Sequence, residues 1–249
     1  MVLSRAAAPQ RVGDLSKRFK GQTCAYCGEP DASSTSDHVI PRQFLPERLR
    51  ANLPQVPACA ACNSAKSIDE HYLATVLPFG GNHPEASAML DRDVPRRLEK
   101  NRKLHQALTD GRADIRLNQD GVIEETFALP VEADRLARFA RRMIQGMHAH
   151  HWGPIPQDMW VGAGMLSAEG TKFHNEVMHW NGRRLRGDVG RGLFSYAALR
   201  SFEPPYISAW WLRLFGGVLM GGDPRAPDYY SRDLWGLVTT KPHPEMFGD

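Results

Sequence analysis

The chain has 249 residues, of which 42% are hydrophobic and 24% are charged, and its formal net charge is +3. This length and composition are ordinary for a soluble globular protein, with room for one large domain or two modest ones. No apolar run approaches the ~20 residues of a membrane-spanning helix, and the small positive charge permits a nucleic-acid partner without indicating one.

Residues 1–20 contain no apolar core of signal-peptide length, and their basic residues continue past any plausible cleavage point. We therefore expect a short N-terminal tail and a protein that stays in the cytoplasm, with no membrane partner. Thiols are kept reduced in that compartment, so closely paired cysteines indicate a metal site in preference to disulfides.

The four cysteines lie in two short motifs, CAYC with Cys24 and Cys27, and CAAC with Cys59 and Cys62. A CxxC pair places two thiolates on one tight turn, and two pairs supply the tetrahedral sulfur set that suits Zn²⁺. A redox CxxC would need only one pair, beside a βαβ pattern that this sequence lacks. A site closed by four cysteines has no open position for substrate, so we expect this zinc to be structural.

After the second motif, the Pro/Gly-rich stretch 77–85 predicts a domain boundary. The segment 91–108 predicts a basic helix that begins near Pro95. The segment 113–129 predicts a β-hairpin, because strand-forming residues flank the strong turn signal Asp120-Gly121.

A change of periodicity at residue 131 predicts an amphipathic helix that runs to about His151. Its apolar positions recur at helical spacing: Leu136, Phe139, Ala140, Met143, Ile144 and Met147. The segment 207–222 predicts a second hairpin that turns at Gly216-Gly217, and 234–240 predicts a further strand.

The fold class expected from these elements is α+β. We predict an N-terminal domain over residues 21–75, followed by a mixed α+β domain of unknown role over residues 85–249.

Three other features have structural explanations that compete with functional ones. The HAHH run at 148–151 could bind a metal, but the usual partner ligands are not visible, and a polar helix C-terminus is the simpler interpretation. A group of aromatic residues could stack on bases, but a core position is the default for most of them: Trp210, Trp211, Phe215 and Trp235. Strand alternation puts Trp210 and Trp211 on opposite faces, which places at least one of them in the core. A set of basic residues fits a phosphate-binding surface and a solvated helix face about equally, namely Arg96, Arg97, Lys100, Arg102 and Lys103.

Around the cysteine motifs the sequence reads C-x2-C-G (24–28), D-H-V-I-P-R (37–42), N-L-P-x-V-P-x-C (52–59) and C-N-x2-K (62–66). In this order and spacing it resembles the HNH endonuclease family, in its zinc-stapled branch. The resemblance covers about residues 20–70, roughly a fifth of the chain.

This resemblance implies a ββα-metal finger, in which a β-hairpin packs on a helix and one catalytic metal lies between them. The first strand would end at Asp37-His38 and the second would follow Asn52. The helix would start near Cys62-Asn63, and the four cysteines would bind the structural zinc beside it.

The resemblance also implies what the side chains do. His38 would be the general base that takes a proton from water, and an imidazole suits this task because its pKa lies near working pH. Asp37 and Asn63 would hold the catalytic metal through hard oxygen atoms, which suit Mg²⁺ or Mn²⁺. The metal would act as a Lewis acid that stabilises the departing 3′ oxygen. Asn52 would hold the loop or the general base in place by hydrogen bonds.

Ordinary structural roles compete with each of these assignments. Asp37-His38 could be a turn pair before a proline, and Asn63 could cap the helix. Lys66 could contact phosphate, as could Arg42, or it could be a solvated surface residue. The joint order of these residues between two cysteine motifs favours the nuclease site.

We therefore expect a metal-dependent endonuclease that hydrolyses phosphodiester bonds in double-stranded DNA, leaving the 5′-phosphate and 3′-hydroxyl ends that the family implies. Two alternatives stay open. One is a non-catalytic zinc-dependent nucleic-acid-binding module that uses the same cysteines. The other makes the C-terminal domain the functional core, with the finger as an accessory. The sequence selects neither an oligomeric state nor a cleavage specificity.

Overall fold

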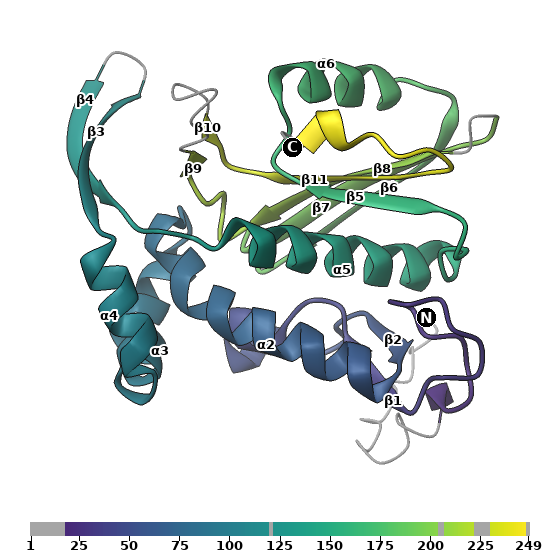
Figure 1. Cartoon of the computed structure of the whole chain (residues 1–249), viewed down its shortest axis with the longest axis horizontal. Helices are drawn as coiled ribbons and strands as arrows, with labels where there is room; N and C mark the ends of the chain where they lie inside the picture. Colours follow the sequence, from purple (N-terminus) through teal and green to yellow (C-terminus); the bar gives the residue numbers. More distant parts are fainter. Residues whose placement is uncertain (1–17, 120–121, 204–206, 222–229, 248–249) are drawn as a thin grey trace, which may run out of the picture.

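A computed structural model describes residues 18–119, 122–203, 207–221 and 230–247 (Figure 1). The fold is α+β, as expected: strands and a helix at the N-terminal side, then a five-stranded sheet with helices on both of its faces. Most of the predicted tail, 1–20, lies outside the described residues. Within the described ranges, no helix combines the length and apolarity that a membrane crossing requires.

The N-terminal unit consists of two short antiparallel strands and a helix. Strand β1 (Thr35–His38) pairs with β2 (Gln55–Ala58), and Thr35 lies opposite Ala58 while His38 lies opposite Gln55. Helix α2 (Ala60–Val76) follows β2 directly. Two single-turn helices lie in the connection between the strands, η1 (Arg42–Phe44) and η2 (Glu47–Leu49). The order strand, strand, helix is the one predicted for this region.

Residues 77–110 form one short helical turn and two α-helices, joined by brief non-helical segments. The turn η3 (Leu77–Gly80) leads to α3 (Pro84–Lys100) and then to α4 (Arg102–Asp110). The prediction that one helix starts near Pro95 is wrong. Pro84 occupies the first turn of α3, where its missing N–H costs nothing, and the Nδ1 atom of His83 caps that turn by accepting from Glu85 N at 3.1 Å. Asn101 then caps the start of α4.

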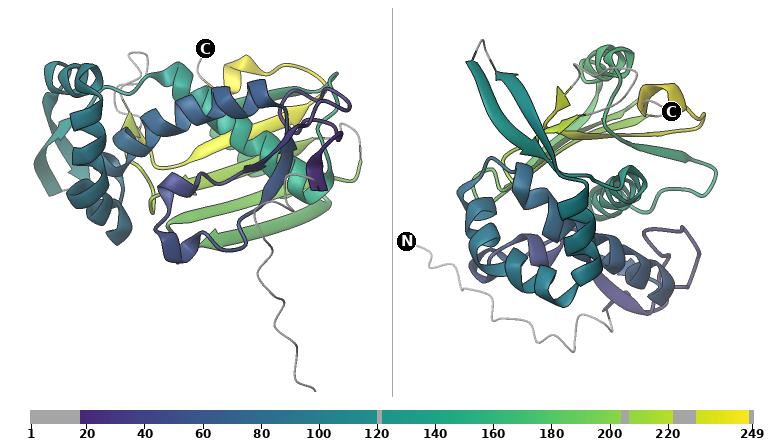
Figure 2. Two further views of the ribbon diagram at one scale, coloured as in Figure 1. Left: turned by 90° about the horizontal axis from the view of Figure 1, so that it is seen from below. Right: turned by 60° about the vertical axis from the view of Figure 1, so that its left-hand side comes forward.

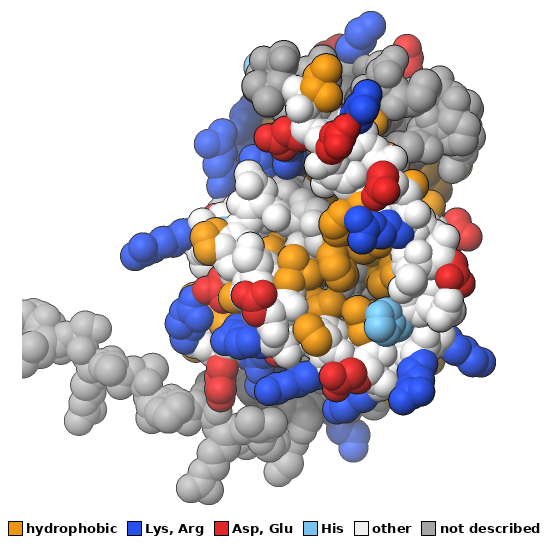
Figure 3. Space-filling view, turned by 90° about the vertical axis from the view of Figure 1, so that its left-hand side faces the viewer, with side chains coloured by type: hydrophobic (Ala, Val, Ile, Leu, Met, Phe, Trp, Pro, Cys, Tyr) orange, Lys and Arg blue, Asp and Glu red, His pale blue; other side chains and the backbone are white. Residues whose placement is uncertain are grey.

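The predicted first hairpin is confirmed, and it stands out from the body of the molecule (Figures 1 and 2). Strands β3 (Ala113–Gln119) and β4 (Val122–Ala128) form an antiparallel pair of their own. The turn at Asp120-Gly121 lies outside the described residues. On this side of the molecule, apolar side chains are surrounded by charges of both signs (Figure 3).

Helix α5 (Ala133–Trp152) lies between the N-terminal unit and the sheet (Figure 1). The predicted helix is confirmed, and all six of the apolar positions named from its periodicity are buried. Gly146 brings α5 close to the end of β1, since a methyl group there would lie 2.8 Å from a methyl carbon of Val39. This contact fixes the helix against the segment that carries Asp37 and His38.

All five strands of the large sheet run antiparallel to their neighbours, in the order β5-β11-β8-β7-β6. Their bounds are Trp160–Gly164 for β5, Gly182–Val189 for β6, Phe194–Ser201 for β7, Ser208–Leu214 for β8 and Leu234–Thr239 for β11. The strand predicted at 234–240 is therefore confirmed. Helix α6 (Ala168–Val177) and the turn η4 (Pro244–Phe247) cover the face opposite α5 (Figure 1).

The second predicted hairpin, 207–222, is wrong. Strand β8 pairs with β7 and β11, while β9 (Met220–Gly221) pairs with β10 (Tyr230–Ser231). Gly216 and Gly217 do turn the chain, with φ of +70° and +102°. The turn leads Val218 to a bridge with Gly81 and not back along β8, because both edges of β8 are already occupied.

The buried core runs without interruption from the N-terminal unit to the sheet. The ring of Phe44, in η1, lies 5.4 Å from that of Phe139 in α5 and 5.3 Å from that of Phe215 after β8. Trp210 is fully buried, as its predicted core role requires. The division into domains at 21–75 and 85–249 stays a prediction about independent folding.

Candidate functional site

The four cysteines form a cluster that is positioned to bind a metal ion. The sulfur atoms of Cys24, Cys27, Cys59 and Cys62 all lie within 4.8 Å of one another. Four thiolates this close repel one another, and a divalent cation removes that repulsion. Four sulfurs at such separations are consistent with tetrahedral zinc. Within the described residues, this is the one group of three or more ionisable ligands that could hold a single ion.

Local backbone geometry prepares the cluster for a metal. Gly28 N donates to Cys24 O at 2.9 Å in a tight turn, and the φ of +72° at Gly28 favours glycine there. Cys59 N donates to the Cys24 sulfur at 3.3 Å, and Cys62 N donates to the Cys59 sulfur at 3.4 Å. Burial raises the pKa of Cys24, but backbone hydrogen bonds at Cys27, Cys59 and Tyr26 outweigh it and bring the pKa to about 7. These contacts favour the thiolate form at Cys24, whereas burial raises the pKa of Cys27 and of Cys62, so those two thiols need a bound cation to lose their protons.

A buried polar cluster lies beside the cysteines and consists of Tyr26, Asp37, Lys66 and Glu70; we call it the Asp37 cluster. The Lys66 ammonium lies 2.9 Å from Asp37 Oδ2, donates to His38 O at 2.9 Å, and also pairs with Glu70. Tyr26 Oη donates to the same Asp37 oxygen. Only 1% of the Lys66 side chain is exposed, so the ammonium depends on these partners for its stabilisation.

The Asp37 cluster favours particular protonation states. Burial raises the pKa of Tyr26 well above its ordinary value, and the Asp37 charge raises it further, so the phenol stays neutral and donates. Burial also raises the pKa of Glu70, although the nearby ammonium of Lys66 opposes this effect. The prediction that Lys66 is a solvated or phosphate-binding residue does not fit its position.

His38 lies on the other face of β1 from Asp37, because successive side chains of a strand point to opposite faces. Its Nε2 atom lies 3.0 Å from Nε2 of Gln55, the residue directly opposite on β2. Burial lowers the pKa of His38, and the charges of Arg42 and Lys66 lower it further, although the charge of Asp37 opposes them. The ring is therefore neutral at neutral pH, which is the form a general base needs.

Asn63 lies in the first turn of α2, and its Nδ2 atom donates to Thr35 Oγ1 at 3.1 Å. It does not cap the helix, because Cys59 occupies the cap position. Thr35 and Asp37 share one face of β1, so the Asn63 amide and the Asp37 carboxylate both lie at the contact between β1 and α2. Among the described residues, the Asn63 hydrogen bond uses only the amide nitrogen, so the amide oxygen is available as a ligand.

Asn52 lies in the loop before β2 and adopts a left-handed conformation with φ of +59°. Asparagine tolerates this conformation better than most residues, so Asn52 shapes the entry to β2. The amide that contacts His38 belongs to Gln55. Sequence patterns did not indicate Gln55, Tyr26 or Glu70 as site residues. The strand register would have indicated Gln55, but the sequence does not fix that register.

The HAHH run at 148–151 is a structural feature. Nδ1 of His148, which is buried, lies 2.8 Å from Gly153 O, and Nε2 of His151 lies 3.1 Å from Tyr196 Oη. These contacts hold the end of α5 and agree with its interpretation as a polar helix terminus.

No protein-family model, no curated protein and no solved structure matches this chain. The site must therefore be interpreted from its own geometry.

Proposed function

We propose that this protein is a metal-dependent endonuclease of the HNH kind that hydrolyses phosphodiester bonds in DNA. The observation that carries the proposal is the position of Asp37 and His38 on opposite faces at the end of β1, in the segment between the two cysteine pairs of one cluster. The Asp37 side chain lies against α2, the helix that carries Asn63.

In this proposal the cysteine cluster binds Zn²⁺. The N-terminal unit is small, and a zinc ion held by residues before β1 and at the start of α2 would tie both strands to the helix. Because all four positions are filled by sulfur, this ion would contribute stability and not chemistry.

A second ion, Mg²⁺ or Mn²⁺, would be held by Asp37 and Asn63. Their oxygen atoms suit these ions, and both side chains lie at the same contact between β1 and α2. When bound, such an ion supplies Lewis-acid stabilisation of the leaving oxygen. Lys66 would then share Asp37 with the ion and keep Glu70 as a second partner.

His38 would accept a proton from the attacking water through Nδ1. For that, the ring proton must sit on Nε2, and the Nε2–H group must donate a hydrogen bond to Gln55. Gln55 Oε1 is buried without a partner among the described residues, so rotation of the amide by half a turn would give Oε1 this hydrogen bond. Gln55 would thereby fix the tautomer that a general base requires.

One observation favours the second candidate, a zinc-dependent nucleic-acid-binding module without catalysis. The Lys66 ammonium already neutralises Asp37 at 2.9 Å, which reduces the need for a further cation there. In that case the Asp37 cluster would serve only to hold β1 against α2.

A nicking assay separates the two candidates. Zinc-loaded wild-type protein, His38→Ala and the control His105→Ala, an exposed residue on α4, are incubated with supercoiled plasmid and Mg²⁺ or Mn²⁺. We expect wild type and the control to nick the plasmid and His38→Ala to be at least about 100-fold slower, the range of a lost general base. Equal nicking by all three proteins, or none by any, would refute catalysis at His38. DNA binding without nicking would favour the module.

A further inference from the structure

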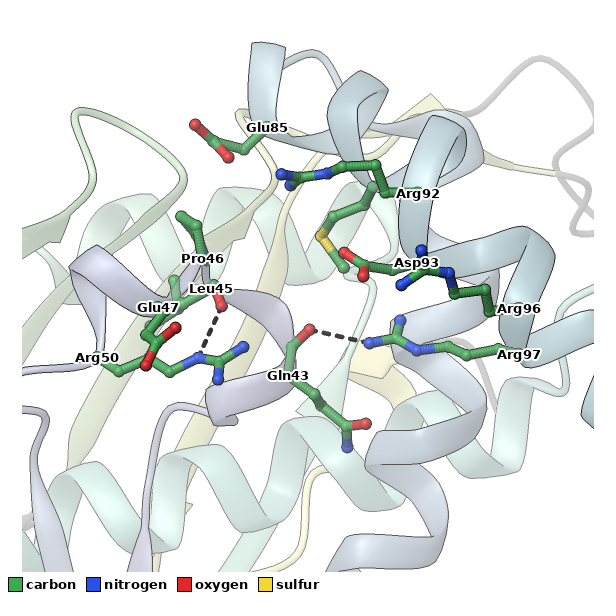
Figure 4. Close-up of a pocket in the computed structure, with 11 residues that line it drawn as sticks. Gln43, Leu45, Pro46, Glu47, Arg50, Glu85, Arg92, Asp93, Arg96 and Arg97 are labelled. Carbon is green, nitrogen blue, oxygen red and sulfur yellow. Dashed lines mark hydrogen bonds between the residues drawn. The ribbon is translucent and has the colours of Figure 1, made fainter.

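A hollow of about 340 Å³ lies on the surface between helix α3 and the loop that follows β1. Residues of η1, η2 and the segments beside them line one side, and α3 lines the other (Figure 4). We call it the arginine hollow, after its four arginines: Arg50, Arg92, Arg96 and Arg97.

The four guanidinium groups approach the hollow from two directions. Arg92, Arg96 and Arg97 extend from α3, and Arg50 extends toward them from the end of η2 (Figure 4). In the part of the chain that the structure describes, the ion pairs include no carboxylate partner for any of the four. Like charges that outnumber the carboxylates around them repel one another, and an anion in the hollow would relieve that repulsion.

Backbone contacts hold the arginines in place without neutralising them. Arg97 donates to Gln43 O at 3.3 Å and to Ala74 O, so its guanidinium bridges η1 and the end of α2. Arg50 Nε donates to Leu45 O at 3.0 Å, and Arg92 Nε donates to Ala88 O at 3.2 Å. Both bonds use Nε, which leaves the terminal nitrogens of these side chains free to form the fork that matches a phosphate.

Acidic residues also line the hollow, and they do not cancel its charge. Glu85 is paired with Arg48. Glu47 lies near Arg50 at the edge, and Asp93 lies among the α3 arginines (Figure 4). The four arginines of the hollow and Arg48 together carry five positive charges, against three negative charges on the carboxylates that line it. Burial lowers the pKa of Arg97. The negative charge of Asp93 opposes this effect and the positive charge of Arg50 adds to it, so Arg97 interacts with both of these neighbours.

We propose that the arginine hollow binds a backbone phosphate of the DNA on which the candidate active site acts. This inference rests on the proposed function and adds a positioning contact to it. The loop that leaves β1 at His38 continues into η1, where Gln43 accepts from Arg97, so the hollow and the candidate active site share one continuous segment. A phosphate held there would set where the duplex lies relative to β1.

The test measures binding without cleavage. Zinc-loaded full-length protein is titrated into a fluorescently labelled 20-base-pair duplex, in buffer without added Mg²⁺ or Mn²⁺, at several salt concentrations. The double variant Arg92→Gln/Arg96→Gln is compared with wild type. Arg183→Gln/Arg186→Gln removes the same charge from exposed positions on β6 and is the matched control. Circular dichroism and thermal unfolding show whether each variant is folded.

We expect the hollow variant to bind about tenfold or more weakly at moderate salt. We also expect the slope of log Kd against log salt to fall by about one, for the single phosphate contact that is lost. The control should keep a wild-type slope and affinity within about twofold. Wild-type binding by the hollow variant, an equal loss in the control, or no DNA binding by wild type would each overturn the proposal.

A further measurement distinguishes a strand phosphate from a free anion. If inorganic phosphate raises the thermal midpoint of wild type but not of the hollow variant, and both bind DNA equally, the hollow is a small-anion site and the proposal is overturned. Because binding is read separately from nicking, the two proposals can fail independently. Protein that binds DNA through the hollow but never nicks it refutes only the nuclease, and a hollow variant that binds and nicks normally refutes only the DNA contact.

Discussion

Lys66 shows how strongly the surroundings of a single residue determine its role. It follows Asn63 by one helical turn, and this spacing directs it toward β1, where Asp37 and Glu70 enclose its ammonium group. A lysine with 1% of its side chain exposed cannot contact a passing phosphate. Its positive charge instead compensates two carboxylates that would otherwise repel each other in a buried site.

Replacing Lys66 therefore has a predictable cost. Lys66→Met keeps much of the volume but leaves Asp37 and Glu70 without a cation, so we expect the free energy of unfolding to fall by about 3–5 kcal/mol. Urea unfolding measures this. Lys103→Met, at an exposed position of α4, should change stability by less than about 0.5 kcal/mol. A loss below about 1 kcal/mol in Lys66→Met would mean that the ion pairs contribute little.

Replacing Gln55 tests whether this residue controls the protonation of the His38 ring. In Gln55→Glu a carboxylate replaces the amide that contacts the ring, and this negative charge favours the protonated imidazole. We expect the pKa of His38 to rise by about one unit or more. The protein would then need a higher pH to hold the neutral base, so the acid limb of any nicking profile should move upward.

The His38 titration, followed by NMR, reads this change without relying on activity. Gln106→Glu, at an exposed position of α4, is the control and should leave the pKa of His38 unchanged. An unchanged pKa in Gln55→Glu would show that Gln55 does not control the ring.

At the scale of secondary-structure elements, β1, β2 and α2 depend on the cysteine cluster. Each strand has four residues, and an isolated pair of this length is not stable in water. The cluster joins the turn before β1 to the first turn of α2, so a bound ion would link all three elements.

Removing the metal should therefore unfold this region. We expect one zinc per chain, and we expect Cys27→Ser or a strong chelator to lower stability by several kcal/mol, since binding to a structural site contributes directly to folding. Metal analysis gives the stoichiometry, and thermal unfolding gives the loss. Full stability in protein shown to contain no metal would contradict the structural role.

At the scale of the whole molecule, the N-terminal unit is packed onto the rest through a shared core. Phe44 contributes one ring to a cluster of tilted rings that includes Phe139 and Phe215. We expect Phe44→Ala to lower the free energy of unfolding by about 3–5 kcal/mol, because it opens a cavity at this junction. Because the core is shared, we also expect zinc release and the change in tryptophan fluorescence to occur at the same denaturant concentration when wild-type protein unfolds. Zinc release at clearly lower denaturant would show that the unit at 21–75 unfolds separately.

Buried histidines make the whole fold sensitive to acid. Burial lowers the pKa of His148 to about 4, despite the Gly153 backbone hydrogen bond, and it lowers the pKa of His174 to about 4 as well. Both rings are neutral in the native state and titrate near 6.5 when unfolded. Their neutral forms therefore permit full stability above about pH 6.5, and stability is lost as the pH falls from there toward 4.

His174→Leu tests this acid sensitivity. Each histidine accounts for about 3 kcal/mol at pH 4, from a pKa difference of about 2.5. The stability of His174→Leu relative to wild type should therefore improve by about that amount between pH 7 and pH 4. Urea unfolding at a series of pH values measures the difference. A constant difference across that range would contradict burial of a neutral His174.

Short-range patterns predicted several elements correctly. The cysteine motifs predicted the two sulfur pairs of the metal-binding cluster, because a CxxC turn brings two sulfurs together whatever lies around it. The periodicity of 131–151 predicted α5, and the Asp120-Gly121 signal predicted the hairpin at 113–129. Each of these signals acts over a few neighbouring residues, and the sequence alone was sufficient for them.

Pairing between distant segments was decided by the tertiary structure. The sequence predicted a turn at Gly216-Gly217 but not that β7 and β11 occupy both edges of β8. It placed Asp37 and His38 at the end of a strand, but their partners Lys66 and Gln55 depend on how α2 and β2 lie against β1. The arginine hollow likewise requires η1 and α3 to meet. Covalent spacing fixes contacts along the chain, whereas contacts across it depend on how the shared core packs.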